Sequence, residues 1–160
     1  MKHFLLLVVL CSLFIAVSGC QSALKPSDLP KLYPCTLTIT QKGQMLAGAV
    51  VELIAQDTDK AKYVPLQRTG EKGVVVMTTY GFDGVPAGKY KVVITKNIEE
   101  TTKQLDKNTG ETIIKDGTRY RTVEAVYSGA ATTPLEIEIT GKERNVKLNL
   151  DAGKAVKQKI

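Results

Sequence analysis

The stretch Cys35-Thr36-Leu37-Thr38-Ile39-Thr40 alternates apolar residues with threonine. A period of two places the apolar side chains on one face of a strand and the threonines on the other. β-Branched residues such as threonine and isoleucine also favour strands. The stretch therefore predicts a half-buried strand, in which Cys35 acts as a small buried apolar residue.

The same kind of pattern recurs along the chain, with turn-forming residues between most of the repeats. We expect further strands at residues 49–54, 64–68, 74–79, 90–95, 135–139 and 146–150. No stretch shows the 3.6-residue periodicity of a persuasive amphipathic helix. Short strands at this spacing predict an all-β sandwich or barrel.

Two of these predictions concern particular strands. Residues 74–79 are β-branched and apolar, so we expect a strand that is covered on both faces. Residues 135–139 and 146–150 both alternate, and Gly141-Lys142-Glu143-Arg144 joins them. That arrangement predicts an antiparallel hairpin.

The alternation lapses at residues 97–126, which we expect to form an inserted long loop with a small hairpin. Residues 99–109 are polar, and Asp116-Gly117 is a turn signal between two candidate β segments. Long loops on rigid scaffolds often carry function. The alternative is a tolerated surface insertion.

Residues 1–19 have the features of a signal peptide, with a basic start, an apolar run over residues 4–17 and small residues at the end. The apolar run is short for a membrane-spanning helix, which takes about 20 residues. Val17-Ser18-Gly19-Cys20 resembles the lipobox of bacterial lipoproteins. That resemblance implies cleavage between Gly19 and Cys20 and a lipid on the Cys20 thiol. The alternative is an ordinary signal peptide with an incidental cysteine.

Three further regions follow from composition. Residues 20–34 contain prolines among polar and small residues, which predicts a flexible tether. Residues 35–150 would form the sandwich. Residues 151–160 form a basic tail, either a solvated terminus or a weak adhesion surface for anionic lipid or polysaccharide.

Composition also limits the chemistry. His3 is the only histidine, so removal of the signal peptide leaves no imidazole for catalytic triads or for metal ligation. Removal of the signal and lipidation of Cys20 would leave Cys35 as the one free thiol, which allows no internal disulfide. The net charge of +6 is interspersed through most of the chain, and we expect no nucleic-acid partner and no cofactor.

Several ordered motifs resemble carboxypeptidase regulatory-like domains. They are Leu46-Ala47-Gly48-Ala49-Val50-Val51-Glu52-Leu53, Thr69-Gly70-Glu71-Lys72-Gly73-Val74 and Val85-Pro86-Ala87-Gly88-Lys89-Tyr90-Lys91-Val92. Residues 125–128, 132–137 and 145–150 are similar to the ending of small lipoproteins of planctomycete-type bacteria, which pair a lipobox with one such domain. The resemblance implies an Ig-like or transthyretin-like Greek-key sandwich of about seven strands. It brings no mechanism, since such domains are mostly accessory.

These features predict a lipid-anchored, non-catalytic cell-envelope lipoprotein whose sandwich makes protein or glycan contacts. Gln21 follows Cys20 where an aspartate would suggest inner-membrane retention, so we expect the outer membrane. No metal site is expected, because Asp57-Thr58-Asp59 lacks the glycine and distal glutamate of an EF-hand and favours a turn.

Two alternatives remain. A carbohydrate-binding module would stack sugars on exposed aromatic residues, and Tyr80 and Phe82 are the best pair, although both could cap the core instead. An enzyme would need a carboxylate pair. The candidates are Glu99 with Glu100, Asp57 with Asp59, and Glu136 with Glu138.

Overall fold

The computed structural model describes residues 25–110, 112–142, 144–150 and 158–159. The predicted signal peptide and its cleavage and lipidation residues, Gly19 and Cys20, lie outside this part. Among the described residues, no helix has the length and apolar character needed to cross a membrane.

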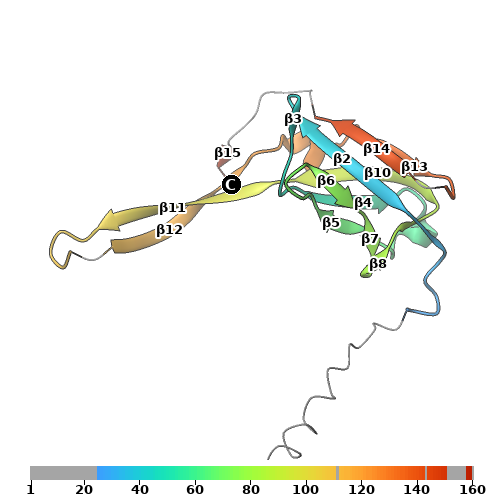
Figure 1. Cartoon of the computed structure of the whole chain (residues 1–160), viewed down its shortest axis with the longest axis horizontal. Coiled ribbons are helices and arrows are strands. Elements are labelled where there is room, and N and C mark those ends of the chain that lie inside the picture. Colours follow the sequence, from blue (N-terminus) through green and yellow to red (C-terminus); the bar gives the residue numbers. More distant parts are fainter. Residues whose placement is uncertain (1–24, 111, 143, 151–157, 160) are drawn as a thin grey trace, which may run out of the picture.

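The described chain folds as an all-β sandwich of two packed sheets, as the alternation predicts (Figure 1). The first sheet contains β2 (Cys35–Gln41), β3 (Gln44–Met45), β6 (Val74–Val76) and β14 (Arg144–Asn149). The second sheet contains β4 (Val50–Ala55), β5 (Leu66–Arg68), β10 (Gly88–Thr95) and β13 (Glu136–Ile139). Short pairs flank them: β1 (Leu32–Tyr33) with β9 (Val85–Pro86), and β7 (Thr78–Thr79) with β8 (Phe82–Asp83).

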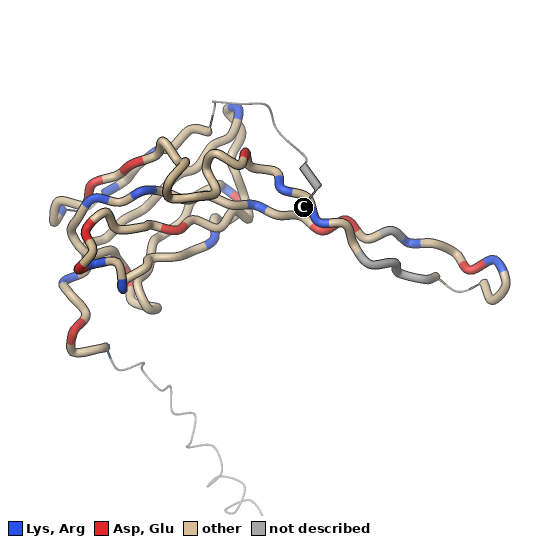
Figure 2. The backbone as a smooth tube through the Cα atoms, turned by 180° about the vertical axis from the view of Figure 1, so that it is seen from behind, with Lys and Arg blue, Asp and Glu red and all other residues tan. Residues whose placement is uncertain are grey.

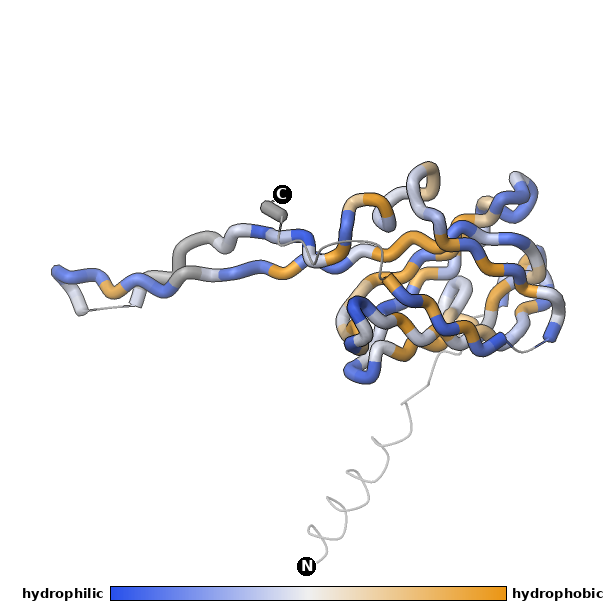
Figure 3. The backbone as a smooth tube through the Cα atoms, turned by 90° about the horizontal axis from the view of Figure 1, so that it is seen from above, coloured by the Kyte–Doolittle hydropathy of each residue, from blue (hydrophilic) through white to orange (hydrophobic). Residues whose placement is uncertain are grey.

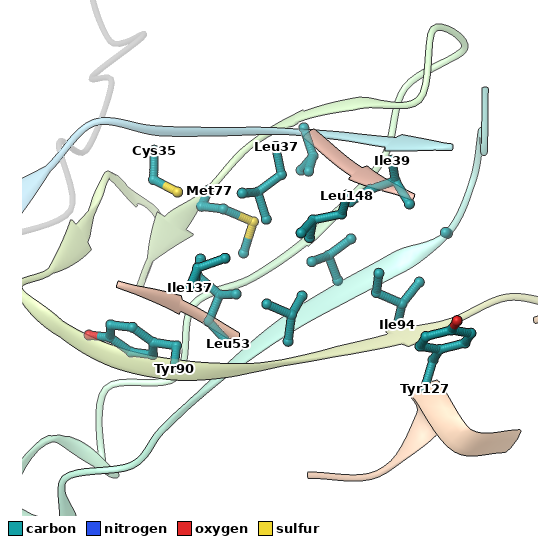
Figure 4. Packing of buried hydrophobic residues seen from close by; sticks show 14 of the residues in the cluster. Cys35, Leu37, Ile39, Leu53, Met77, Tyr90, Ile94, Tyr127, Ile137 and Leu148 are labelled. Atoms are coloured by element: carbon teal, nitrogen blue, oxygen red, sulfur yellow. The ribbon is translucent and has the colours of Figure 1, made fainter. Parts of the chain in front are cut away.

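The core lies between the two sheets (Figure 4). In β2, Cys35, Leu37 and Ile39 are fully buried, and the threonines between them are half-buried, as predicted. Burial raises the pKa of the Cys35 thiol to about 11, because the charged thiolate loses its hydration. The buried Tyr90 donates from its hydroxyl to the carbonyl of Pro86 at 2.8 Å, which satisfies the polar end of an otherwise apolar side chain.

The C-terminal strands do not form the predicted antiparallel hairpin. β13 pairs antiparallel with β10, with Ile137 opposite Tyr90. β14 pairs parallel with β2 in the other sheet, with Leu148 opposite Ile39. The link between them therefore crosses from one sheet to the other. The alternation is the same in both arrangements, since each strand turns its apolar side chains into the one core.

The prediction that residues 74–79 are covered on both faces is also wrong. The segment divides into β6 and β7. Val75 and Met77 enter the core, whereas Val74 and Val76 are 38% and 53% exposed on the outer face of the first sheet. β-Branched residues fit a pleated strand whether or not both faces are covered, so their composition does not require burial.

Residues 97–121 form a long β-hairpin, which we call the arm (Figure 1). Its strands are β11 (Asn97–Leu105) and β12 (Thr112–Arg121), which pair antiparallel, and β15 (Gln158–Lys159) pairs with the base of β12. The predicted turn at Asp116-Gly117 is wrong. These two residues lie within β12, where both oppose Thr101 and so make a β-bulge.

Candidate functional site

The second half of the predicted tether packs against the sandwich. Leu29 is buried, and β1 pairs with β9, with Leu32 opposite Pro86. The prediction of a flexible tether over residues 20–34 is therefore wrong for this described part. Proline and polar residues suggested a linker, but a single well-placed leucine and a two-residue strand attach it to the domain. Residues 20–24 lie outside the described chain.

Asp28, Lys62 and Tyr63 fasten this segment, and we call them the clamp. The Lys62 ammonium donates to the Asp28 carboxylate at 2.8 Å, and its nitrogen lies 4.8 Å from the centre of the Tyr63 ring. The buried Tyr63 donates from its hydroxyl to the backbone carbonyl of Asp28. The hydrogen bond from Lys62, followed by its charge, holds the pKa of Asp28 below its usual 3.8.

Tyr80 and Phe82, the predicted ligand contacts, lie beside the clamp. Tyr80 and Gly81 are the two turn residues of the β7–β8 hairpin, with φ of 54° and 82°, as a type I′ turn requires. The Tyr80 hydroxyl donates to the backbone carbonyl of Lys62, and its ring meets Tyr63 edge-on at 6.1 Å. Tyr80 is 55% exposed and Phe82 is half-buried. The observed contacts of Tyr80 are thus with the clamp, and sugar binding by this pair stays a prediction.

One carboxylate of each predicted pair makes an ion pair or a turn contact. Lys91 donates to Glu136 at 2.5 Å, and this contact lowers the pKa of Glu136. Glu99 lies 3.7 Å from Arg119. Asp57 accepts from the amide of Asp59 at 3.1 Å and begins a short 3-10 helix, η1 (Thr58–Lys60), which confirms the predicted turn. Among the described residues, no group of three or more His, Cys, Asp or Glu could hold a metal ion.

A firm base joins the arm to the sandwich. Gln41, at the end of β2, donates from its side-chain amide to the carbonyl of Thr122 at 3.1 Å. Val123 is fully buried, and Tyr127 of the 3-10 helix η2 (Ala125–Ser128) is 3% exposed and packs at the end of the core near Ile94 (Figure 4). The residues after β12 therefore return into the core and fix where the arm begins.

Beyond this base the arm carries mostly hydrophilic residues (Figure 3). Charges of both signs lie along it (Figure 2). Glu99 and Lys103 are exposed on β11, and the turn at the tip carries Asp106 and Lys107. Leu105, next to the tip, is 61% exposed. An isolated two-stranded hairpin is marginally stable in water, so the buried base and the cross-strand pairs must hold the arm together.

The docked segment that precedes β2 and the arm lie at opposite ends of the sandwich (Figure 1). The docked segment enters β2 at Cys35, and the seven-residue strand ends at Gln41 against the base of the arm. The sequence does not predict the clamp, and for the arm it predicts only a small hairpin within a long loop. The polar sequence of the arm does not mark two long strands, and the clamp joins residues more than thirty positions apart.

No family model and no curated protein sequence matches the chain. A solved structure, a 9R-lipoxygenase from Cyanothece PCC8801, is similar with a TM-score of 0.34 and 13% sequence identity. The similarity covers 79% of this chain and 18% of that chain. A likeness this weak carries no conclusion about fold or activity.

Proposed function

We propose that this chain is a lipid-anchored, non-catalytic protein of the cell envelope that presents its arm to a protein partner. The observation that supports this most is the placement of the docked segment and the arm at opposite ends of the sandwich (Figure 1). An anchor at Cys20 would hold the clamp end near the membrane. The arm then points away from that end.

The distance from the membrane follows from the docked segment. Only the residues between Cys20 and Asp28 remain to span from the lipid to the clamp, which is at most roughly 30 Å of extended chain. The clamp thus shortens the reach of the tether and gives the domain a preferred end toward the membrane. Two or three acyl chains on Cys20 would make the attachment stable, since one chain alone is marginal. We assign the outer membrane, because Gln21 follows Cys20.

The chemistry of the described residues supports a contact role. Glu136 is paired with Lys91, Glu99 lies beside Arg119, and Asp57 caps a turn. The arm offers exposed backbone, charged residues of both signs and one exposed leucine near its tip. These are features of a protein-binding hairpin on a rigid support.

The anchor is tested by labelling cells with radioactive palmitate. The label should be present on the unaltered chain and on a Ser22→Ala control, and absent from Cys20→Ser. Label that survives Cys20→Ser would contradict the anchor.

The arm is tested by placing a photo-crosslinking amino acid at Leu105 and, as a matched control, at Leu66. Leu66 is 51% exposed on the sandwich, close to the 61% of Leu105. We expect a discrete protein adduct in envelopes from position 105 and none from position 66. Equal adducts from both positions, or none from position 105, would contradict presentation by the arm.

A further inference from the structure

β11 is an edge strand in the arm. It pairs with β12 on one side, and no strand lies on its other side in the described part of the chain. The β-bulge at residues 116–117 belongs to β12, so β11 keeps a regular run of nine residues. Such a run extends for about 30 Å and offers a ladder of backbone donors and acceptors to another strand.

The sequence of β11 is complementary to itself in one register. Its nine residues are centred on Thr101. If two copies pair antiparallel about that centre, all nine residues overlap and Thr101 faces Thr101 of the second copy. Glu99 then lies opposite Lys103 of the second copy, and Lys103 opposite its Glu99. Opposite charges directly across an antiparallel pair stabilise it.

The neighbouring registers are poorer. An axis one residue earlier, at Glu100, brings the two Glu100 carboxylates together, and like charges opposite each other are destabilising. An axis one residue later, at Thr102, sets Glu99 against Leu105 and shortens the overlap. The full-length register is therefore also the one with matched charges.

The same register suits the contacts already present within the arm. Glu99 lies 3.7 Å from Arg119 on β12, so it would sit between that arginine and Lys103 of the second copy. Lys103 is exposed and has no ion-pair partner among the described residues. A lysine on an edge strand ordinarily discourages pairing. Here the charge of Lys103 favours pairing with a strand that has a carboxylate opposite it, and disfavours pairing with other strands.

We propose that two copies of this chain associate edge to edge through β11, with the two-fold axis at Thr101, to form one four-stranded sheet from two arms. The partner is a second copy because the strand matches itself in charge, and a two-fold contact requires the same surface on both subunits. This inference rests on the proposed role of the arm in binding protein, and it names that partner.

The axis is tested by disulfide crosslinking of the full chain with Cys11 and Cys20 changed to serine, which leaves the buried Cys35. Thr101→Cys should give a covalent dimer under mild oxidation, because the two sulfurs would face each other across the axis. The matched control is Thr118→Cys on β12 of the same arm, which should stay monomeric. A dimer from Thr118→Cys as readily as from Thr101→Cys, or none from Thr101→Cys, would overturn the inference.

The charge match is tested by sedimentation of two single variants. Lys103→Glu leaves the Glu99–Arg119 contact in place and puts carboxylates opposite each other at positions 99 and 103 of the two copies. Glu99→Lys puts two ammonium groups opposite each other at the same positions. Each variant alone should dissociate about tenfold more readily than the unaltered chain. An equal mixture should regain the dimer, since each lysine then meets a glutamate. Unchanged association of Lys103→Glu, or a mixture that stays monomeric, would overturn the register.

Failure here is distinguishable from failure of the proposed function. A photo-adduct from position 105 to a different protein, with no Thr101→Cys dimer, would overturn self-association and leave presentation by the arm intact. Thr101→Cys dimers, together with no palmitate label on the unaltered chain, would instead support the pairing and contradict the anchor.

Discussion

Tyr63 donates a hydrogen bond from its hydroxyl to the backbone carbonyl of Asp28, 35 positions earlier in the chain. This contact joins the sandwich to the segment that precedes it. The Lys62–Asp28 ion pair and the β1–β9 pairing act on the same segment. The route from the N-terminal segment into the domain is therefore set by tertiary contacts.

Replacing Tyr63 with phenylalanine should loosen this segment. The change removes one hydroxyl and leaves the ring in place, so we expect a loss of about 0.5–1.5 kcal/mol in the local free energy of opening. Hydrogen exchange at residues 28–33 would measure it. Tyr80→Phe removes a neighbouring hydroxyl that binds Lys62 instead, and it should leave exchange at residues 28–33 nearly unchanged. Equal effects from both variants would contradict a specific role for Tyr63.

Acid should weaken the clamp. The pKa of Asp28 is lowered in the folded chain, mainly by its hydrogen bond from Lys62. Its contribution to docking is therefore present above its usual pKa of 3.8 and is lost as the pH falls through the lowered value. Protection factors of residues 28–33, measured between about pH 6 and pH 2, should fall at the acid end. Lys62→Gln should lose that step, and a step that persists in the variant would contradict this assignment.

Two glycines with similar backbone angles should differ in their sensitivity to alanine. Gly43 has φ of 74° and an added Cβ would meet nothing within 4 Å, so Gly43→Ala should cost about 1–2 kcal/mol from backbone strain alone. Gly73 has φ of 66°, but its Cβ would lie 2.5 Å from the carbonyl oxygen of Ile39. Gly73→Ala should cost roughly 1–3 kcal/mol more from overpacking. Urea unfolding of both variants would show the difference, and equal costs would contradict it.

Cys35 should be inert in the folded protein. Its thiol is buried and its pKa is raised to about 11, and the thiolate is the reactive form. Alkylation near pH 8 should be slow until urea unfolds the chain. Cys35→Ser should destabilise by about 1–3 kcal/mol, because it buries a hydroxyl in an apolar site, and more than Cys35→Ala does. Fast alkylation of the folded chain would contradict the buried assignment.

The strands themselves could be predicted well from local pattern. β2 begins at Cys35, as the alternation predicts, and β10 includes the predicted strand at residues 90–95. Its alternating residues Tyr90, Val92 and Ile94 are all buried. The exposed Val76 shows the limit of that reasoning, since composition alone does not tell which faces are covered. Asp116-Gly117 shows a second limit. The pair is compatible with a turn or a bulge, and the pairing of Glu100 with Thr118 and of Thr102 with Lys115 shows a bulge.

The candidate site could be predicted less well. The sequence predicts Tyr80 as an exposed loop aromatic, and it is exposed, but its hydroxyl donates to the backbone carbonyl of Lys62 in the clamp. For the arm, the sequence predicts an inserted loop with a small hairpin that turns at Asp116-Gly117, which the structure places within β12. Its polar sequence hides the strands, because both faces of the arm meet water and no apolar alternation marks them.

Local sequence is enough to predict that this chain is all-β and that Cys35, Leu37 and Ile39 face a core, and it shows that His3 is the only histidine. Those properties depend on residue type and on the two-residue period of a strand. The three-dimensional contacts are needed to show that β13 and β14 enter different sheets, that Asp28 is bound by Tyr63, and that the arm leaves from the opposite end. A period of two tells which side chains share a face, whereas the choice of partner depends on contacts between residues far apart in the chain.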